Sequence, residues 1–233
     1  MRSVSFICAI LVILLAGAIT FHRLGDASIR LDSDEVIHAR VTQEMHQSGA
    51  YFAPTHGGYP YWQKPPLSMW MSTAALRLFG ENNFGFRAGS AVCGFALFLL
   101  IPLLSQRLFG GSPLPGVIAI LVLLGSRTLI LGEHGIRTAT PDASLLLLTV
   151  AAMLCIWSAL AAPATASLAL SWLGVGVFTG LAVYSKSVVG FLPLCVMVAL
   201  AALPKSVTGI ARERIVLRNV VVACFLGIAI PAT

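Results

Sequence analysis

Long apolar runs separated by short polar segments are the dominant pattern along this chain. The first run, residues 4–21, would be about 27 Å long as an α-helix at about 1.5 Å per residue. That length is just enough to cross the hydrocarbon core of a bilayer. The pattern predicts seven membrane spans, at residues 4–21, 84–105, 114–131, 143–160, 168–184, 188–203 and 219–233.

Both ends of the chain lie in apolar runs. The first run also fits a cleaved signal peptide, because Ala16, Gly17 and Ala18 supply small residues near its end. Since more spans follow, a retained helix is the simpler interpretation. The chain stops at Thr233 inside its last run. A natural terminus rarely lies within a membrane, so we expect this chain to be the N-terminal portion of a longer protein.

A long loop, residues 22–83, separates the first two predicted spans. Its final part, residues 67–79, is apolar but too short to span a membrane, and it contains Arg77. Pro65 and Pro66 precede this segment, and proline is favoured at the start of a helix. We therefore expect a helix that lies at the membrane interface rather than across the membrane.

The composition indicates the same class of protein. The chain is 58% hydrophobic and only 10% charged, whereas soluble domains are roughly 45–50% apolar and about 25% charged. This predicts an all-α integral membrane protein. The net charge of +6 does not indicate nucleic-acid binding, because the Lys and Arg residues are spread along the chain. The cysteines lie in apolar runs without metal-ligand spacing, which favours packing roles: Cys8, Cys93, Cys155, Cys195 and Cys224.

The Lys and Arg residues predict the orientation instead, because positive charge concentrates on the cytoplasmic side of a membrane. The cytoplasmic segments would carry Arg2, Arg107 and the basic loop 204–218. In a Gram-negative bacterium the opposite face is periplasmic. We therefore expect a multi-pass protein of the bacterial cytoplasmic (inner) membrane, with one composite polar site facing the periplasm. Three segments would form that site: 22–83, 132–142 and 185–186.

Acidic residues open the polar helix expected at about residues 34–47. Ser33 has the N-cap position, and Asp34 and Glu35 fall in the first turn, where they oppose the positive end of the helix dipole. Capping alone would explain them. A functional role is favoured because ionised groups near a bilayer are costly. An aromatic loop also follows, and its rings suit the apolar faces of a sugar or simply anchor the interface.

Lys64 lies between that aromatic loop and a proline pair. Its ammonium offers three donors, which suits a phosphate oxygen. Pro65 and Pro66 restrict the backbone beside it. Snorkelling of Lys64 to lipid head groups is the alternative. The aromatic residues of the loop are Tyr51, Phe52, Tyr59, Tyr61 and Trp62.

Two further charged residues are predicted on the same face. Asp142 begins a span and either caps that helix or contributes to the site. Lys186 lies in a short turn between two spans, where its partner is either lipid phosphate or a bound ligand.

Nothing in the sequence assigns a metal or a nucleotide. The histidines share the outer face but lack a recognisable metal-ligand spacing. There is no phosphate-binding Gly-rich loop and no nucleotide fingerprint, so an ATP-driven or nucleotide-sugar mechanism is unsupported. The histidines are His22, His38, His46, His56 and His134.

These motifs follow a specific order. They are Asp34-Glu35, Gln43-Glu44-Met45 with Ser48-Gly49, Tyr61-x-x-Lys64-Pro65-Pro66-Leu67, Leu78-Phe79-Gly80 with Arg87, Pro141-Asp142, and Gly180 to Lys186. Their combination resembles the bacterial aminoarabinose transferase and protein-mannosyltransferase-like family, membrane glycosyltransferases of the GT-C class. The resemblance covers nearly the whole chain from Asp32 onward.

The resemblance implies a multi-span helical bundle of GT-C type with interfacial helices in the first loop. It also implies transfer of a sugar from a polyprenyl-phosphate donor to lipid A, protein or another glycan at the outer face. Asp34 would be the principal catalytic carboxylate with Glu35 beside it, and Lys64 would bind the donor phosphate. Membrane lipids are further expected partners. The other expected substrate-binding residues are Tyr61, Asp142 and Lys186.

Three departures from the family's pattern affect these expectations. Gln63 stands where relatives commonly have a Glu that serves as a metal ligand in the aminoarabinose branch, so no cofactor is assigned and a divalent metal stays open. Ile37 and His38 stand where relatives often have Arg-Tyr, so the substrate preference is expected to differ. The family's enzymes are also considerably longer than this chain.

Two other functions remain as alternatives. A transporter usually places polar groups near the bilayer midplane on broken helices. Here the predicted spans have almost no charge at their centres, with Arg127 as a partial exception. The other alternative is a catalytically inactive fragment that binds polyprenyl lipid.

Overall fold

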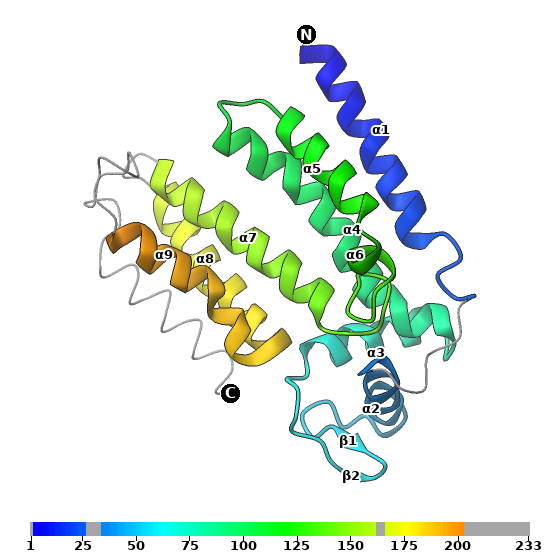
Figure 1. Ribbon diagram of the computed structural model, residues 1–233. Helices are drawn as coiled ribbons and strands as arrows, with labels where there is room; N and C mark the ends of the chain where they lie inside the picture. The colour runs from blue at the N-terminus through cyan, green and yellow to red at the C-terminus, as the bar shows by residue number, and fades with distance from the viewer. Residues whose placement is uncertain (1, 27–33, 162–165, 203–233) are drawn as a thin grey trace.

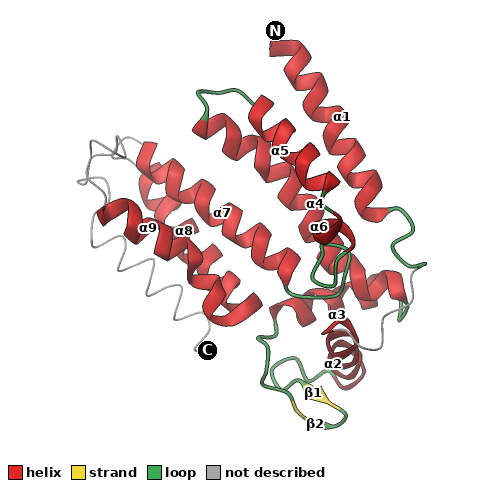
Figure 2. Ribbon diagram, viewed as in Figure 1, coloured by secondary structure: helices red, strands yellow, loops and turns green. Residues whose placement is uncertain are grey.

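A computed structural model describes residues 2–26, 34–161 and 166–202 of the chain. The described part is almost entirely helical (Figures 1 and 2). The elements are α1 (Arg2–Phe21), α2 (Asp34–Ser48), β1 (Thr55–His56), β2 (Tyr59–Pro60), α3 (Leu67–Phe79), α4 (Asn83–Leu108), α5 (Leu114–Gly125), α6 (Arg127–Leu131), α7 (Asp142–Ala161), α8 (Ala166–Lys186), η1 (Ser187–Phe191) and α9 (Leu192–Ala202).

The long apolar helices form a bundle in which α1, α4, α5 and α7 run alongside one another (Figure 1). Within the described residues, three segments are long and apolar enough to cross a membrane: Asn83–Leu108, Asp142–Leu160 and Leu168–Leu200. The prediction of an all-α multi-span membrane protein is therefore confirmed. The first predicted span is a helix, but its described apolar part, Ser5–Phe21, is shorter than those three.

The predicted span 114–131 is wrong as a single helix. Ser126 breaks it into α5 and α6, because its backbone is extended and its side chain caps α6 by accepting a hydrogen bond from Leu129 N–H at 3.3 Å. At about 1.5 Å per residue, α5 alone is too short to cross the hydrocarbon core. Arg127 is thus the first residue of α6 rather than an interior residue of a span.

The predicted spans 168–184 and 188–203 correspond to α8 and to η1 with α9. The chain reverses within η1, where Gly190 packs so closely on α8 that an added Cβ would lie 2.2 Å from Val183 N. The structure shows η1 followed by only 11 residues of α9, where a full span was expected. The predicted span 219–233, the basic loop 204–218 and the predicted N-cap Ser33 lie outside the described residues.

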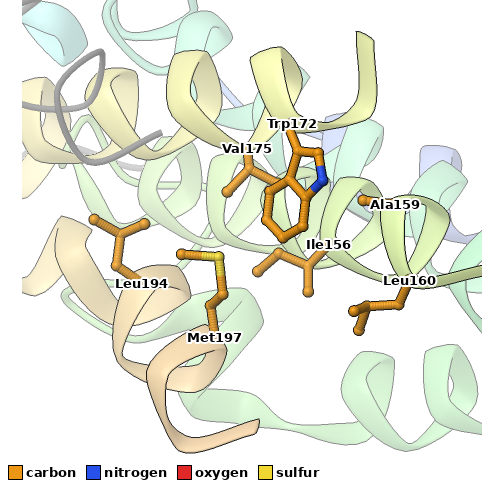
Figure 3. Close-up of a cluster of buried hydrophobic side chains, with 7 residues drawn as sticks. All are labelled: Ile156, Ala159, Leu160, Trp172, Val175, Leu194 and Met197. Carbon is orange, nitrogen blue, oxygen red and sulfur yellow. The ribbon is translucent and has the colours of Figure 1, made fainter. Parts of the chain in front are cut away.

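A buried apolar cluster joins the last three helices. Figure 3 shows Trp172 and Val175 of α8 facing Leu194 and Met197 of α9, with Ile156 of α7 between them. Full burial of one large apolar side chain stabilises the folded state by roughly 1.5–3 kcal/mol. The cluster packs the C-terminal part of α7 against the N-terminal half of α8. The predicted site residues Asp142 and Lys186 lie at the other end of these two helices.

The first loop forms a separate layer at one end of the bundle. Figure 1 shows α2, α3 and the β1–β2 hairpin grouped at its lower end. Residues 67–79 form α3, as predicted, and the Trp70 ring of α3 lies 5.8 Å from that of Tyr184 in α8. Val41 and Met45 of α2 pack with Met69 of α3. Through α3, which contacts both α2 and α8, this layer brings the start of α2 near the segment before α7.

Candidate functional site

Four charged side chains that the sequence predicted as site residues lie at the end of the bundle where α2, α3 and the β1–β2 hairpin are grouped. Asp34 is the first residue of α2, and Asp142 is the first residue of α7. Lys64 lies in the loop before α3, and Lys186 is the last residue of α8. They form two ion pairs, Asp34 with Lys64 and Asp142 with Lys186. The charges of Lys64, Asp34 and Asp142 all affect the ring of His38, which is four residues after Asp34 in α2.

The Asp34 carboxylate is accessible from the solvent. Its Oδ2 atom lies 3.6 Å from Lys64 Nζ, and the two side chains are 40% and 30% exposed. The Asp34 backbone N–H donates to Glu133 Oε1 at 3.3 Å, which ties the start of α2 to the segment before α7. An exposed ion pair of this kind contributes little to stability, so both charges can turn to a ligand at small cost.

Asp142 is more enclosed and has two basic neighbours. Lys186 Nζ donates to its Oδ1, and His134 Nδ1 lies 3.3 Å from its Oδ2. Asp142 is positioned by the hydroxyls of Ser144 and Ser185, which both donate to the Pro141 carbonyl, at 2.8 and 2.9 Å. These bonds join the first turn of α7 to the last turn of α8.

The segment before Asp142 is fixed against α4. Ile136 is fully buried, and it packs so closely on Gly94 that an added Cβ there would lie 2.5 Å from the Ile136 Cβ. Ser90 Oγ donates to the Thr140 carbonyl at 3.1 Å. A glycine at position 94 therefore allows the approach that sets the position of Asp142.

Glu35 does not lie open beside Asp34, where the resemblance placed it as a second catalytic carboxylate. It is 3% exposed, and Arg87 of α4 donates to both of its oxygens, at 2.7 and 2.9 Å. The Ala139 backbone N–H donates to Glu35 Oε1 at 3.0 Å. Arg87 also donates to the Leu24 carbonyl at 3.2 Å. The pair thus joins four separate segments of the chain and has the geometry of a structural clamp.

Tyr61 is buried between the first loop and the core. It is 6% exposed and packs with Val41, Met45 and Met69. Burial, and then the negative charge of Asp34, raise the pKa of its phenol. The phenol is therefore neutral at ordinary pH and can donate a hydrogen bond. Tyr61 packs with residues of α2 and also lines an apolar pocket beside Lys64, which suits a residue that shapes the site.

An apolar pocket of about 400 Å³ opens next to Lys64. Phe52 and Trp62 of the first loop form one wall, and Val188 and Phe191 of η1 form another. Lys64 also lines this pocket, so one ammonium borders both the apolar space and the Asp34 carboxylate. The sequence predicted that Lys64 and the aromatic loop belong to the site, but not that they and η1 would line an apolar pocket.

The sequence marked His38 only as an outer-face histidine and as a departure from the family's pattern, and did not predict that it is a buried site residue. It is 2% exposed, and neither ring nitrogen has a hydrogen-bond partner among the described residues. Burial is the main cause that lowers its pKa to about 4, and the Lys64 charge adds to this effect. The spacing from Asp34 could have indicated this role, because a residue four positions later lies on the same face of a helix.

Metal-ligating groups do not gather in the part of the chain that the structure describes. No group of three or more His, Cys, Asp or Glu side chains there could hold a metal ion. His46 instead lies 3.8 Å from Glu81, and His134 lies beside Asp142. Gln63, next to Lys64, is neutral. The described residues therefore assemble no such cluster, and the divalent metal that the sequence left open stays an expectation.

Sequence comparison relates the chain to lipid-linked-sugar glycosyltransferases. The family model described as dolichyl-phosphate-mannose-protein mannosyltransferase matches residues 63–232. A protein of Pseudomonas fluorescens named undecaprenyl phosphate-alpha-4-amino-4-deoxy-L-arabinose arabinosyl transferase 2 is 32% identical over 167 residues, which cover 72% of this chain and 28% of that protein. The corresponding transferase of Edwardsiella ictaluri is 32% identical over 171 residues, covering 73% and 30% of the two chains.

Solved structures share the fold. The crystal structure of ArnT from Cupriavidus metallidurans in the apo state has a TM-score of 0.75 at 19% identity, covering all of this chain and 41% of that one. The structure bound to undecaprenyl phosphate has a TM-score of 0.78 at 20% identity, covering 95% and 40%. This chain thus spans less than half the length of the proteins that it matches.

Proposed function

This chain belongs to the dolichyl-phosphate-mannose-protein mannosyltransferase family, and we propose that its protein transfers a sugar from a polyprenyl-phosphate donor to an acceptor. The acceptor is lipid A, a protein or another glycan, and the reaction takes place at the periplasmic face of the bacterial inner membrane. The related proteins are named for an undecaprenyl phosphate sugar and an arabinosyl transfer, which makes that donor the first one to test.

The position of Lys64 carries this proposal. A polyprenyl-phosphate sugar has an apolar chain, a phosphate and a sugar in that order. The apolar pocket, the Lys64 ammonium and the Asp34 carboxylate follow one another in the same order. The isoprenoid chain would enter between the first loop and η1, with its phosphate at Lys64. The sugar would then lie towards Asp34.

The reaction that this order supports is a displacement at the anomeric carbon. An acceptor oxygen forms a bond to that carbon while the bond from the carbon to the phosphate oxygen breaks. The electron pair leaves with the polyprenyl phosphate, whose charge Lys64 stabilises. Asp34 orients the acceptor and, for a hydroxyl acceptor, takes its proton. One base suffices for an inverting displacement of this type, unlike the carboxylate pair of glycosidases.

The remaining predicted residues have supporting roles in this proposal. Asp142, paired with Lys186, lines the far side of the site and offers acceptor oxygens to sugar hydroxyls. Tyr61 closes the gap between the pocket and α2. Glu35, held by Arg87, positions Asp34 without touching the substrate. This distribution of polar groups at one end of the bundle is unlike that of a transporter, which binds near the midplane.

A transfer assay tests the proposed function. Membranes from cells that express the complete open reading frame containing this chain would receive radiolabelled undecaprenyl-phosphate sugars, beginning with 4-amino-4-deoxy-L-arabinose. We expect label to move into lipid A, protein or glycan fractions. An Asp34→Asn variant, expressed at the same level, provides the inactive control. Absence of transfer from every donor in the panel would overturn the proposal.

A further inference from the structure

We propose that His38 contacts the substrate, and that its neutral imidazole hydrogen-bonds a hydroxyl of the donor sugar between Asp34 and Asp142. This inference rests on the proposed function, because it supposes that the sugar of the donor occupies that space. It adds a residue that determines how the sugar is bound, one full helical turn from the carboxylate of Asp34.

The unpaired ring is the first observation. Buried polar groups in proteins almost always have partners, and each one left unsatisfied costs about 1–3 kcal/mol. Both nitrogens of His38 lack a partner among the described residues, although the ring is 2% exposed. A position that served packing alone would favour an apolar side chain. The two ring nitrogens are therefore available to hydrogen-bond a ligand.

A second buried polar atom without a hydrogen bond belongs to Asp142. Asp142 Oδ2 is buried and has no hydrogen bond among the described residues, since His134 Nδ1 lies 3.3 Å away without hydrogen-bond geometry. Asp142 is among the charged groups whose electrostatic effect reaches His38. The Asp142 carboxylate and the His38 imidazole each have a polar atom without a hydrogen bond, and the hydroxyls of one sugar that reached both groups would satisfy them.

The charge state of His38 suits a hydroxyl better than a phosphate. A neutral imidazole has one donor and one acceptor nitrogen, and a sugar hydroxyl likewise donates and accepts. A phosphate would favour the protonated ring. The surroundings oppose protonation, because burial and the Lys64 ammonium both lower the pKa. Lys64 would bind the donor phosphate, and His38 would bind a hydroxyl of the donor sugar.

Because His38 is 2% exposed, a sugar reaches it only when neighbouring side chains move. Lys64 is free to turn, since its side chain is 30% exposed and its ion pair with Asp34 is long at 3.6 Å. When the ammonium turns towards the donor phosphate, Asp34 loses its partner, and the sugar can take its place beside Asp34 and His38. The same movement would thereby link phosphate binding to sugar binding.

Two lipid probes separate a sugar contact from a general effect. The complete protein in detergent would be titrated with bare undecaprenyl phosphate and with undecaprenyl phosphate 4-amino-4-deoxy-L-arabinose, and binding would be measured by native mass spectrometry. His38→Phe is expected to weaken the sugar-bearing probe roughly tenfold, the loss typical of a hydrogen bond, and to leave bare undecaprenyl phosphate unchanged. His38→Gln keeps a donor and an acceptor and should recover most of the loss.

Control variants decide between the remaining outcomes. His46→Phe changes a histidine of the same helix that faces Glu81, and it should alter neither affinity. Lys64→Ala should weaken both probes. Equal loss of both probes in His38→Phe, or no loss at all, would overturn the assignment of His38. Failure of the unsubstituted protein to prefer any sugar-bearing lipid over the bare one would instead overturn the proposed function as well.

Discussion

Glu35 and Arg87 form a buried bidentate ion pair, with distances of 2.7 Å from Nε to Oε1 and 2.9 Å from Nη2 to Oε2. They lie 52 residues apart in the chain. Asp34, the neighbour of Glu35, is 40% exposed and faces Lys64. Two adjacent carboxylates at the start of one helix thus have opposite environments, and we infer from this difference that one is structural and the other functional.

Loss of the Glu35 carboxylate should chiefly affect stability. Removing one partner of a buried pair leaves an uncompensated charge, which typically costs about 3–5 kcal/mol. We expect Glu35→Ala to lower the free energy of unfolding by this amount, measured by chemical denaturation in detergent. Glu81→Ala removes a more exposed carboxylate and should cost less than about 1 kcal/mol. Loss of sugar transfer by Glu35→Ala at unchanged stability would show that Glu35 is catalytic after all.

Loss of the Asp34 charge should affect activity and not stability. Its ion pair is exposed, so Asp34→Asn should change the free energy of unfolding by less than about 1 kcal/mol. Removal of a general base typically lowers the rate by about 10²–10⁴-fold. Transfer of radiolabelled sugar by membranes checks this expectation. Asp26→Asn, at the exposed pair with Arg23, is the matched control and should be fully active. Normal activity of Asp34→Asn would exclude it as the base.

Lys64 should govern the use of the donor lipid. A hydrogen bond to a charged group is worth about 1.5–3 kcal/mol, so Lys64→Ala should raise the donor KM by roughly 10–100-fold. Initial rates at increasing donor concentration measure this. Arg23→Ala removes an exposed cation elsewhere and should leave the KM unchanged. A phosphate role for Lys64 is ruled out if the two variants depend on donor concentration in the same way.

Burial of His38 should make the protein sensitive to mild acid. The pKa of His38 in the folded state is about 4, below its usual 6.5. Between pH 4 and pH 6.5 the imidazole is therefore protonated in the unfolded state and neutral in the folded state. The free energy of unfolding should therefore fall as pH drops from 6.5 to 4, by about 3 kcal/mol in total. The facing charged groups are Lys64, Asp34, Asp142 and His134. Denaturation of the protein and of His38→Gln across this range gives the contribution by difference, and identical pH profiles would contradict it.

Glu44 should hold the β1–β2 hairpin against α2. Its carboxylate accepts hydrogen bonds from Thr55 Oγ1 at 2.7 Å and from the amides of Gly57 and Gly58 at 2.8 and 3.2 Å. The Thr55 bond is the main cause that lowers the Glu44 pKa to about 2, so this stabilisation is present above pH 4.5 and is lost as pH falls towards 2. Glu44→Gln should speed amide hydrogen exchange at both glycines at neutral pH. Glu81→Gln serves as the control, and unchanged exchange in Glu44→Gln would refute the role.

The apolar runs alone determined the class of the protein. Runs of the length of 84–105 and 143–160 have few ways to bury their side chains other than a helical membrane bundle, so the pattern predicted α4 and α7. The proline pair before Leu67 likewise predicted the start of α3. The break at Ser126 was missed, because hydrophobicity does not report the backbone angle of one residue within an apolar run.

Charge patterning determined which residues gather at one end, and tertiary contacts decided what each of them does. The sequence placed Asp34, Glu35, Lys64, Asp142 and Lys186 on one face, since topology fixes the ends of helices. It could not distinguish Asp34 from Glu35, because the difference arises from Arg87 on another helix. Nor could it show that His38 is buried without a partner among the described residues. Burial and pairing depend on neighbours that are distant in sequence, and only the packed structure brings them together.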